Sequence, residues 1–299
     1  MRVICGYIKK IYYIILDNIV YFIKKIKFKL FDSNKKKLGI NDNKLENDRK
    51  IIVSLTSIPS RFDKLYLCLE SIMEQTMKPD KIILYLGLNT IDIELPKALL
   101  KMKQRGLEIK YKEDNKLKPH TKYFYAMQEF PNDIIITFDD DILYNKKVIQ
   151  KLYNSYLKYP EAVSCIRAHK ITFNKDGKIE KYNNWEYEYK EKGLLVPNKF
   201  LLATGVGGIL YPPHCMPQET FNIEKIYRLS LNTDDLWLKA MQIKGGIKVV
   251  KAMKKNYHLN VIKDTQDIAL CKGNVEQCQN DESMNKIMKY YKIQEEDFN

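Results

Sequence analysis

Short apolar runs alternate with helix-like patterns between residues 51 and 166. The run at 51–55 is rich in β-branched residues and predicts a buried strand. After it, Leu65, Leu69 and Ile72 repeat at the spacing of one helical face. The same patterns predict strands at 81–86, 107–111, 133–138 and 162–166 and helices at 123–130 and 147–159. This alternation predicts an α/β fold with a Rossmann-like, doubly wound and mostly parallel sheet, whose ligands bind at the carboxyl ends of the strands.

The regular alternation fades after residue 166. The segment 201–211 is apolar but contains Gly205, Gly207 and Gly208, which predict either a tight turn or a close approach to the backbone. One further helix and one further strand are predicted, at 234–243 and 247–250. The second half of the chain is therefore expected to add less regular structure to the sheet.

The N-terminal segment combines lysines with an apolar stretch. Residues 1–37 hold ten basic and two acidic side chains, which is +8 of the formal charge of +14. The apolar stretch at 11–23 is interrupted by Asp17 and Asn18 and is followed by no small-residue cleavage site, so we expect neither a membrane span nor a signal peptide. Lys10, Asp17 and Lys24 recur every seven residues, which predicts an amphipathic helix.

Two interpretations of this helix stay open. Its lysines and aromatic residues suit a helix that lies in the interface of an anionic membrane, but its apolar face could equally pack on the protein's own body. The charge excess also has a plain explanation, because lysine is abundant along the whole chain. The polar residues 33–50 that follow, with Gly39 among them, predict a linker.

Length and composition are those of a globular chain with a substantial core. The 299 residues suffice for one large α/β domain or two small ones, and 45% of them are hydrophobic. The six cysteines form no Cys-x-x-Cys pair and no spacing typical of a zinc site or a disulfide framework, so they are predicted to be reduced thiols. The basic excess sits in an apolar-rich terminus, which argues against a nucleic-acid partner.

The strongest chemical signal is an apolar strand that ends in three carboxylates. Residues 134–138 lead directly into Asp139, Asp140 and Asp141. Three such charges at a sheet end repel one another and are costly to desolvate unless a cation or hydrogen-bond donors neutralise them. A divalent ion fits, since Mg²⁺ and Mn²⁺ take oxygen ligands and combine one or two carboxylates with substrate phosphates. The alternative is an acidic turn that is merely solvated.

The residues around this run resemble inverting, family-2-like glycosyltransferases with the GT-A fold, of the type that builds bacterial surface glycans. The carboxylate run is similar to their Asp-x-Asp motif. The segment 53–61 resembles their first strand and donor-binding loop, and 69–76 resembles their first helix with its Ser and Gln-Thr ending. The resemblance extends from about Ile51 to His258. It implies a GT-A domain at 47–270, a basic amphipathic helix and linker at 1–46 and a C-terminal helical tail at 271–299.

The resemblance also implies roles for residues further along the chain. Asp234 and Asp235 look like the family's acidic pair at a helix start, with Asp235 as the catalytic base, although both also suit a helix N-terminus by capping and by the helix dipole. His258 stands close to the place of a metal-ligating histidine, while a lone histidine near a strand end is more often structural. The glycine-containing acceptor loop would correspond to Gly205, Gly207 and Gly208.

On the donor side the resemblance implies a metal ion, Mn²⁺ or Mg²⁺, held by Asp139, Asp141 and His258. Lys118 and Lys122 precede the metal strand and either approach donor phosphates or are solvated loop charges. The residues expected to contact the donor are Thr56, Ser57, Pro59, Arg61, Lys118, Lys122, Asp139 and Asp140. The family's acidic segment after the second strand is replaced here by residues 85–90, Tyr-Leu-Gly-Leu-Asn-Thr, so the nucleotide is poorly defined. A UDP-sugar is the expected donor.

The sequence thus predicts a metal-dependent, hexosyltransferase-like glycosyltransferase that acts with inversion on a glycan or lipid-linked glycan acceptor. We expect it in polysaccharide or lipopolysaccharide synthesis, cytoplasmic and peripheral on the inner face of the cell membrane, with no nucleic acid as partner. One alternative is a metal-dependent nucleotidyl- or phosphotransferase, although no phosphate-binding Gly-rich Lys loop is found. The other is a non-enzymatic polyanion-binding protein, against which the acidic site argues.

Overall fold

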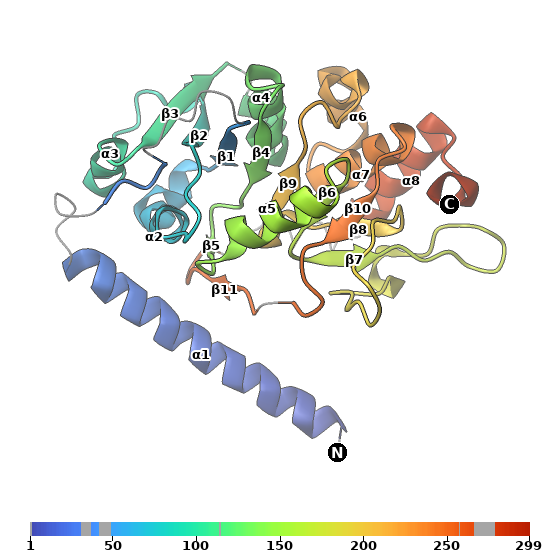
Figure 1. Ribbon diagram of the computed structural model, residues 1–299, viewed down its shortest axis with the longest axis horizontal. Coiled ribbons are helices and arrows are strands. Elements are labelled where there is room, and N and C mark those ends of the chain that lie inside the picture. Colours follow the sequence, from blue (N-terminus) through green and yellow to red (C-terminus); the bar gives the residue numbers. More distant parts are fainter. Residues whose placement is uncertain (1, 31–36, 42–48, 114, 257, 266–278) are drawn as a thin grey trace.

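The computed structural model describes residues 2–30, 37–41, 49–113, 115–256, 258–265 and 279–299. A central sheet carries helices on both faces (Figure 1). Its strands are β1 (Ile51–Thr56), β2 (Lys81–Gly87), β3 (Leu107–Lys112), β4 (Ile134–Thr137), β6 (Val163–Cys165), β9 (Ile209–Tyr211) and β10 (Val249–Lys251). The seven lie in the order β10-β6-β9-β4-β1-β2-β3. All neighbours are parallel except β9, which is antiparallel to both β4 and β6.

Both faces of the sheet are buried because its strands are apolar at successive positions, which point to opposite sides. Val53 belongs to one core cluster and its neighbour Ile52 to the other. Helices α2 (Phe62–Met73), α3 (Lys97–Lys103) and α5 (Val148–Lys158) contribute to the first cluster. Helices α4 (Thr121–Glu129), α6 (Ile223–Leu229), α7 (Asp234–Lys244) and α8 (Gln279–Tyr291) contribute to the second.

Two small antiparallel pairs flank the carboxyl edge of the sheet. The first joins β5 (Ile142–Leu143) to β11 (Asn260–Val261), and the second joins β7 (Ala168–Lys170) to β8 (Leu201–Ala203). Short 3-10 helices are η2 (Pro59–Arg61), η3 (Leu88–Thr90), η4 (Asn115–His120), η5 (Tyr182–Asn184), η6 (Gly205–Gly207), η7 (Gln218–Phe221) and η9 (Glu295–Phe298). The β5–β11 pair brings the chain around residues 258–265 beside the end of β4.

The predicted α/β fold with a mostly parallel, doubly wound sheet is confirmed. The strands and helices predicted up to residue 166 are present within a few residues of their expected bounds. The main difference is β9, which lies in the middle of the sheet, although the segment 201–211 was expected to be irregular. This strand is only three residues long and begins directly after Gly208, so it is too short to show a strand pattern.

The N-terminal helix α1 (Arg2–Leu30) runs along one side of the body, below α2, β5 and β11 in Figure 1. Tyr21 and Phe28 are buried in the first core cluster, and Lys27 forms an ion pair of 2.5 Å with Glu74, the residue that follows α2. Other apolar side chains of α1 are exposed, namely Tyr12, Ile14, Ile15, Ile19, Phe22, Ile23 and Ile26. The interpretation that the helix packs on the protein's own body therefore holds for part of its length, and the membrane interpretation stays a prediction. None of the described helices is long and apolar enough to cross a membrane.

The flanking segments join the same cores. The predicted linker at 33–50 lies partly outside the described residues, and within it the backbone N–H of Gly39 donates to the carbonyl of Arg105 at 2.9 Å. In the predicted tail, Met284 and Ile287 of α8 are buried in the second cluster. Among the cysteines, Cys68 and Cys165 are buried free thiols and Cys215 is partly buried. The side chains of Cys5, Cys271 and Cys278 lie outside the described residues.

Candidate active site

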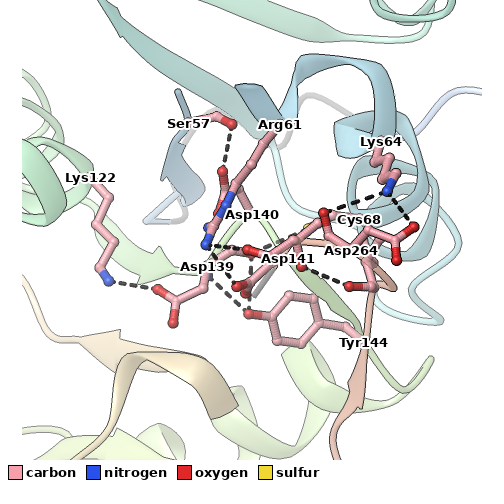
Figure 2. A network of polar contacts seen from close by, with 12 residues as sticks. Ser57, Arg61, Lys64, Cys68, Lys122, Asp139, Asp140, Asp141, Tyr144 and Asp264 are labelled. Carbon is pink, nitrogen blue, oxygen red and sulfur yellow. Dashed lines mark hydrogen bonds and ion pairs between the residues drawn. The ribbon is translucent and has the colours of Figure 1, made fainter. Parts of the chain in front are cut away.

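Three carboxylates stand at the carboxyl end of β4, as the sequence predicted. β4 and β1 are parallel neighbours, so the loop that follows β1 lies at the same edge of the sheet. Asp140 and Asp141 are buried, whereas the side chain of Asp139 is 27% exposed. Figure 2 shows that Arg61 and Ser57 approach this run from one side and Lys122 from another.

Asp140 is held by the loop after β1. The Ser57 hydroxyl donates to its carboxylate at 2.5 Å, and the Arg61 guanidinium forms an ion pair with its other oxygen. Arg61 also lies 3.3 Å from Asp141 and donates to the carbonyl of Thr265 at 3.0 Å. Burial raises the pKa of Asp140, and the contacts with Arg61 and Ser57 oppose that rise only in part. Asp140 is therefore a fixed internal group rather than a freely solvated one.

Lys122 connects the Asp run to the second acidic pair. Its ammonium lies 2.6 Å from Asp139 and 2.9 Å from Asp234. Burial alone lowers the pKa of this lysine, but the carboxylates around it outweigh burial and raise the pKa well above its usual value. Lys122 is thus a permanently charged group inside the site, which excludes the solvated interpretation of this residue.

The acidic pair opens α7, and the structure gives its members different properties. The backbone N–H of Gly205 donates to both oxygens of Asp235, at 3.1 and 3.2 Å. Burial, followed by repulsion from Asp234, raises the pKa of Asp235 to about 8. For Asp234, burial acts in the same direction, but attraction by Lys122 and His120 prevails and the pKa is lowered. Two adjacent carboxylates whose pKa values are pushed apart are typical of paired acid and base roles.

Gly205 lies between Asp139 of the carboxylate run and Asp235 of the acidic pair. A Cβ at this position would lie 2.9 Å from the Lys122 Nζ, 3.2 Å from an Asp139 oxygen and 3.4 Å from an Asp235 oxygen. The missing side chain therefore leaves space between the strand-end carboxylate and the helix-start carboxylate. Gly207 and Gly208 serve packing instead, because a Cβ there would contact Arg167 and Phe138 respectively, and Gly208 has a φ of +89°.

This space predicts the effect of a single methyl group. We expect Gly205→Ala to leave the fold intact, since the clash is with the flexible end of Lys122, but to lower turnover by roughly 10²-fold through displaced carboxylates. Steady-state kinetics with the melting temperature measured in parallel would test this. Gly193→Ala is the matched control, because its new Cβ would have an ordinary contact of 3.4 Å with Glu191. Equal activity of the two variants would contradict the placement of Gly205.

The remaining donor-side residues are nearby but differ in their contacts. The Thr56 hydroxyl donates to the Tyr85 carbonyl at 2.9 Å, which fixes the end of β1. Pro59 begins η2, the short turn that carries Arg61 toward Asp140. Lys118 has a φ of +51° and donates to the Asn232 side chain at 2.7 Å. Of the two lysines predicted to contact the donor, Lys122 thus contacts carboxylates of the site, whereas Lys118 contacts Asn232.

His258 is placed away from its expected partners. Its Nε2 lies 2.6 Å from a carboxylate oxygen of Asp17 in α1, and its ring stacks on Tyr13 with centroids 4.1 Å apart. Among the described residues, no group of three or more His, Cys, Asp or Glu side chains is arranged to hold a metal ion. The structure therefore does not bring His258 together with Asp139 and Asp141, and a ligand role for it stays a prediction.

Two supporting residues, Tyr144 and Cys68, were missed from the sequence, and a third, His120, was not among the predicted site residues. The Tyr144 hydroxyl accepts from the backbone N–H of Asp139 at 2.9 Å, and the Cys68 thiol donates to the Asp139 carbonyl at 3.2 Å. Burial raises the pKa of Cys68 well above its usual value, so the thiol keeps its proton. His120 lies between Tyr123 and the Ser230 carbonyl, each 2.8 Å from a ring nitrogen, and burial lowers its pKa to about 4. Tyr144, three residues past the Asp run, could have been found by proximity alone.

The sequence matches the family described as Glycosyl transferase family 2 over residues 60–210, which is half of the chain and contains the loop of Arg61, Lys122 and the Asp run. The chain belongs to glycosyl transferase family 2. The predicted family, and with it the GT-A type of fold, is thereby confirmed. Asp234 and Asp235 lie beyond the matched residues, so their assignment rests on the geometry of the site. No curated protein matches the sequence.

Comparison with solved structures finds distant similarities at low identity. They include the mannosyltransferase PcManGT from Pyrobaculum calidifontis in complex with GDP-Man and Mn²⁺, at 11% identity and a TM-score of 0.49, covering 93% of this chain and 73% of that one. An inositol-1-phosphate CTP transferase from T. maritima has 13% identity and a TM-score of 0.43, covering 81% and 97%. A CMP:2-keto-3-deoxy-manno-octonic acid synthetase complexed with CTP has 10% identity and a TM-score of 0.42, covering 78% and 99%. Such distant likeness does not discriminate between the reactions that these proteins catalyse.

Proposed function

We propose that this family 2 chain is a metal-dependent glycosyltransferase that moves a sugar from a nucleotide-sugar to a glycan or lipid-linked glycan, with inversion and with Asp235 as the base. One observation carries the proposal. Asp139, at the end of the donor-side strand, and Asp235, at the start of α7, converge on the space left by Gly205. A nucleotidyltransferase would have no evident use for the second carboxylate.

The donor side supplies oxygen ligands and positive charge. Asp139 and Asp141 lie just after the end of β4. Their carboxylate oxygens are ligands that suit Mn²⁺ or Mg²⁺, and donor phosphates would occupy the remaining coordination positions of the ion. When bound, such an ion would stabilise the negative charge of the leaving nucleotide diphosphate. Asp140, fixed by Ser57 and Arg61, is placed for the donor ribose or sugar. We propose that Thr56 and Pro59 of the loop after β1, and Lys118 of η4, also contact the donor, and that the donor is a UDP-sugar.

The acceptor side supplies the base. The acceptor hydroxyl would give its proton to Asp235 while its oxygen bonds to the anomeric carbon and the bond from that carbon to the diphosphate breaks. A base with a pKa near 8 suits proton abstraction near neutral pH. The Gly205 amide orients the Asp235 carboxylate, and Lys122 keeps Asp234 charged beside it. Attack on the face opposite the leaving group inverts the anomeric configuration.

A donor screen tests the proposed reaction class. The purified chain would be mixed with UDP-, GDP-, CMP- and dTDP-sugars, each with and without Mn²⁺, and followed by thermal shift and by donor hydrolysis. Metal-dependent stabilisation by one nucleotide type with release of a nucleoside diphosphate or monophosphate would support the proposal. Release of pyrophosphate would instead identify a nucleotidyltransferase, and no response to any donor would contradict a nucleotide-sugar enzyme.

We also propose that α1 holds the protein on the inner face of the cell membrane. Its exposed apolar side chains recur at Tyr12, Ile15, Ile19, Phe22 and Ile26, which is one helical stripe, and lysines flank it. In a density gradient, we expect the intact chain to float with anionic vesicles and a version starting near Asn47 to remain in the bottom fraction. Ile19→Ser with Phe22→Ser gives the same test without removing the buried Tyr21 and Phe28. Equal flotation of all three proteins would refute this role.

A further inference from the structure

The small β7–β8 pair brings aromatic and charged side chains beside the loop that orients Asp235. Thr204 and Gly205 follow directly after β8, and Arg167 directly precedes β7. The carbonyl of Arg167 accepts from the Thr204 N–H at 3.1 Å. Because the Gly205 N–H donates to Asp235, Arg167 is joined to the residue next to this contact. The end of the β7–β8 pair is therefore adjacent to the proposed base.

Arg167 is also fixed by its side chain. Its Nη1 donates to the Thr204 hydroxyl at 3.2 Å, and its Nε lies 3.4 Å from a carboxylate oxygen of Glu188. A Cβ at Gly207 would lie 2.9 Å from the Arg167 Cβ, so the glycine permits this close approach. The side chains of Arg167 and Glu188 are 18% and 55% exposed, so a ligand can reach both members of the pair.

Glu188 has a backbone conformation that is uncommon for a residue with a Cβ. Its φ is +45°. Its N–H donates to the His169 Nδ1 at 2.9 Å, and its carbonyl accepts from the Asn256 side chain at 2.7 Å. Burial, followed by repulsion from Arg167, lowers the pKa of His169 to about 3, so the neutral ring remains an acceptor. A strained residue that its surroundings hold in place is typical of a functional site.

Two tyrosine rings accompany this charge pair. Tyr187 is 41% exposed, and its ring centroid lies 4.3 Å from that of His169 and 5.5 Å from that of Tyr182. The Tyr187 hydroxyl donates to the Asn183 side chain at 3.0 Å, which fixes the ring. Burial, followed by the charge of Asp235, raises the pKa of Tyr182, so this second ring lies within electrostatic range of the proposed base. An exposed and fixed aromatic ring thus stands between the charge pair and Tyr182.

This combination suits an uncharged pyranose. The C–H groups on one face of such a sugar pack on the negative face of an aromatic ring, while its neighbouring hydroxyls donate to a carboxylate and accept from a guanidinium. A sugar with its own carboxylate would instead bring like charge beside Glu188. We infer that Arg167, Tyr187 and Glu188 form the subsite for the acceptor's sugar, and that this sugar is an uncharged pyranose. The inference rests on the proposed glycosyltransferase function and adds the residues that select the acceptor.

Sugar binding to the full chain tests the aromatic part of this subsite. Methyl glycosides of glucose, galactose, mannose, N-acetylglucosamine and glucuronic acid would be compared by saturation-transfer NMR, which detects weak binding. We expect a neutral glycoside to bind with the strongest transfer at the C–H groups of one ring face. Tyr187→Ala should weaken its binding by roughly tenfold, whereas Tyr187→Phe should not. Tyr290→Ala is the matched control, because Tyr290 of α8 is also 41% exposed.

Binding of none of the neutral glycosides would overturn the inference. Equal weakening by Tyr187→Ala and Tyr290→Ala, or tighter binding of the glucuronide than of every neutral glycoside, would overturn it as well.

The charge pair has its own matched control. Glu188→Gln should weaken the same glycoside by roughly tenfold, as for loss of a hydrogen bond to a charged group. Glu186→Gln should not, although Glu186 is 53% exposed and pairs with Lys170 at the same distance of 3.4 Å. Glu188→Gly should also weaken binding but keep the melting temperature, since glycine adopts a positive φ without strain. Equal effects of Glu186→Gln and Glu188→Gln would show a general loss of surface charge and contradict the subsite.

A failure of this inference can be distinguished from a failure of the proposed function. Donor hydrolysis by the unmodified chain tests the glycosyltransferase proposal alone, and sugar binding tests the subsite alone. If transfer to the bound sugar occurs, Glu188→Gln should raise the KM for the acceptor by roughly tenfold and leave the KM for the donor and the rate of donor hydrolysis unchanged. An unchanged acceptor KM would remove Glu188 from the subsite.

Discussion

Asp235→Asn is expected to lower transfer by about 10²- to 10⁴-fold, the usual contribution of a general base, while donor binding stays close to that of the unmodified chain. The amide keeps the shape of the side chain and one oxygen for the Gly205 N–H, but it cannot accept the acceptor proton. The variant thus separates proton abstraction from the donor contacts at Asp139 and Asp140.

Turnover, the KM for the donor and the Kd of the nucleoside diphosphate would be measured for Asp235→Asn and for Asp176→Asn. Asp176 is an exposed turn residue and serves as the control for the substitution itself. Near-normal turnover of Asp235→Asn would remove this residue from the role of base. A large loss of donor affinity would instead place it on the donor side.

The raised pKa of Asp235 adds a pH dependence of known sign. Because the base must be ionised, kcat/KM should rise as the pH increases through about 8. Stability should move the other way. The folded chain retains a proton that the unfolded chain releases near pH 4, so stability is lost as the pH rises through the folded-state pKa. Asp235→Asn cannot ionise, so its melting temperature should rise relative to that of the unmodified chain as the pH increases from about 4 to about 8, and the difference should stay constant above that.

Replacing Asp139 and Asp141 together by Asn is expected to abolish metal-dependent donor binding and to reduce turnover to the level seen in EDTA. Their oxygens are the protein ligands expected for the ion, and the neutral amides would also leave Lys122 and Arg61 without their full charge partners. Calorimetric titration of Mn²⁺ with the nucleoside diphosphate would measure the loss directly. Full activity of the unmodified chain in EDTA would contradict the metal model.

His258 gives this experiment an internal comparison. His258→Ala should loosen α1, because the contacts with Asp17 and Tyr13 are lost, and it should leave Mn²⁺ affinity unchanged if the observed placement persists during catalysis. A loss of Mn²⁺ affinity similar to that of the Asp variant would restore the ligand role that the resemblance implied.

The strand and its carboxylates could be predicted because a single local pattern encodes them. Residues 134–138 are all β-branched or aromatic, and three aspartates follow directly, so eight consecutive positions predict both the strand and the acidic site. The helix at 234–244 was similarly clear. Local patterns therefore sufficed for the parallel half of the sheet and for the acidic run after β4, whereas the role expected of Asp234 and Asp235 came from the family resemblance.

Groups whose role depends on distant partners were harder to predict. Lys122 looked like a possible solvated charge, because nothing near it in the sequence shows that α4 would aim it at Asp139 and Asp234. His258 follows the irregular stretch after β10, where the sequence has no helical or strand periodicity from which the path of the chain could be predicted. Its partner Asp17 lies 241 positions away in the sequence. A short strand such as β9 depends on its neighbours β4 and β6 for hydrogen bonds, so its own three residues carry little signal.

Lys122 also affects how tightly the site would hold the proposed metal ion. The tethered ammonium already balances Asp139 and Asp234, so the folded chain needs no metal insertion to become stable. Any ion must displace this built-in counter-charge, and we expect it to be held weakly until donor phosphates share it. Under the proposed function, binding of the ion would then follow the concentration of the nucleotide-sugar, and the ion would leave with the spent nucleotide at the end of each cycle. The metal would behave as a second substrate, drawn from the same pool as the donor, rather than as a resident part of the protein.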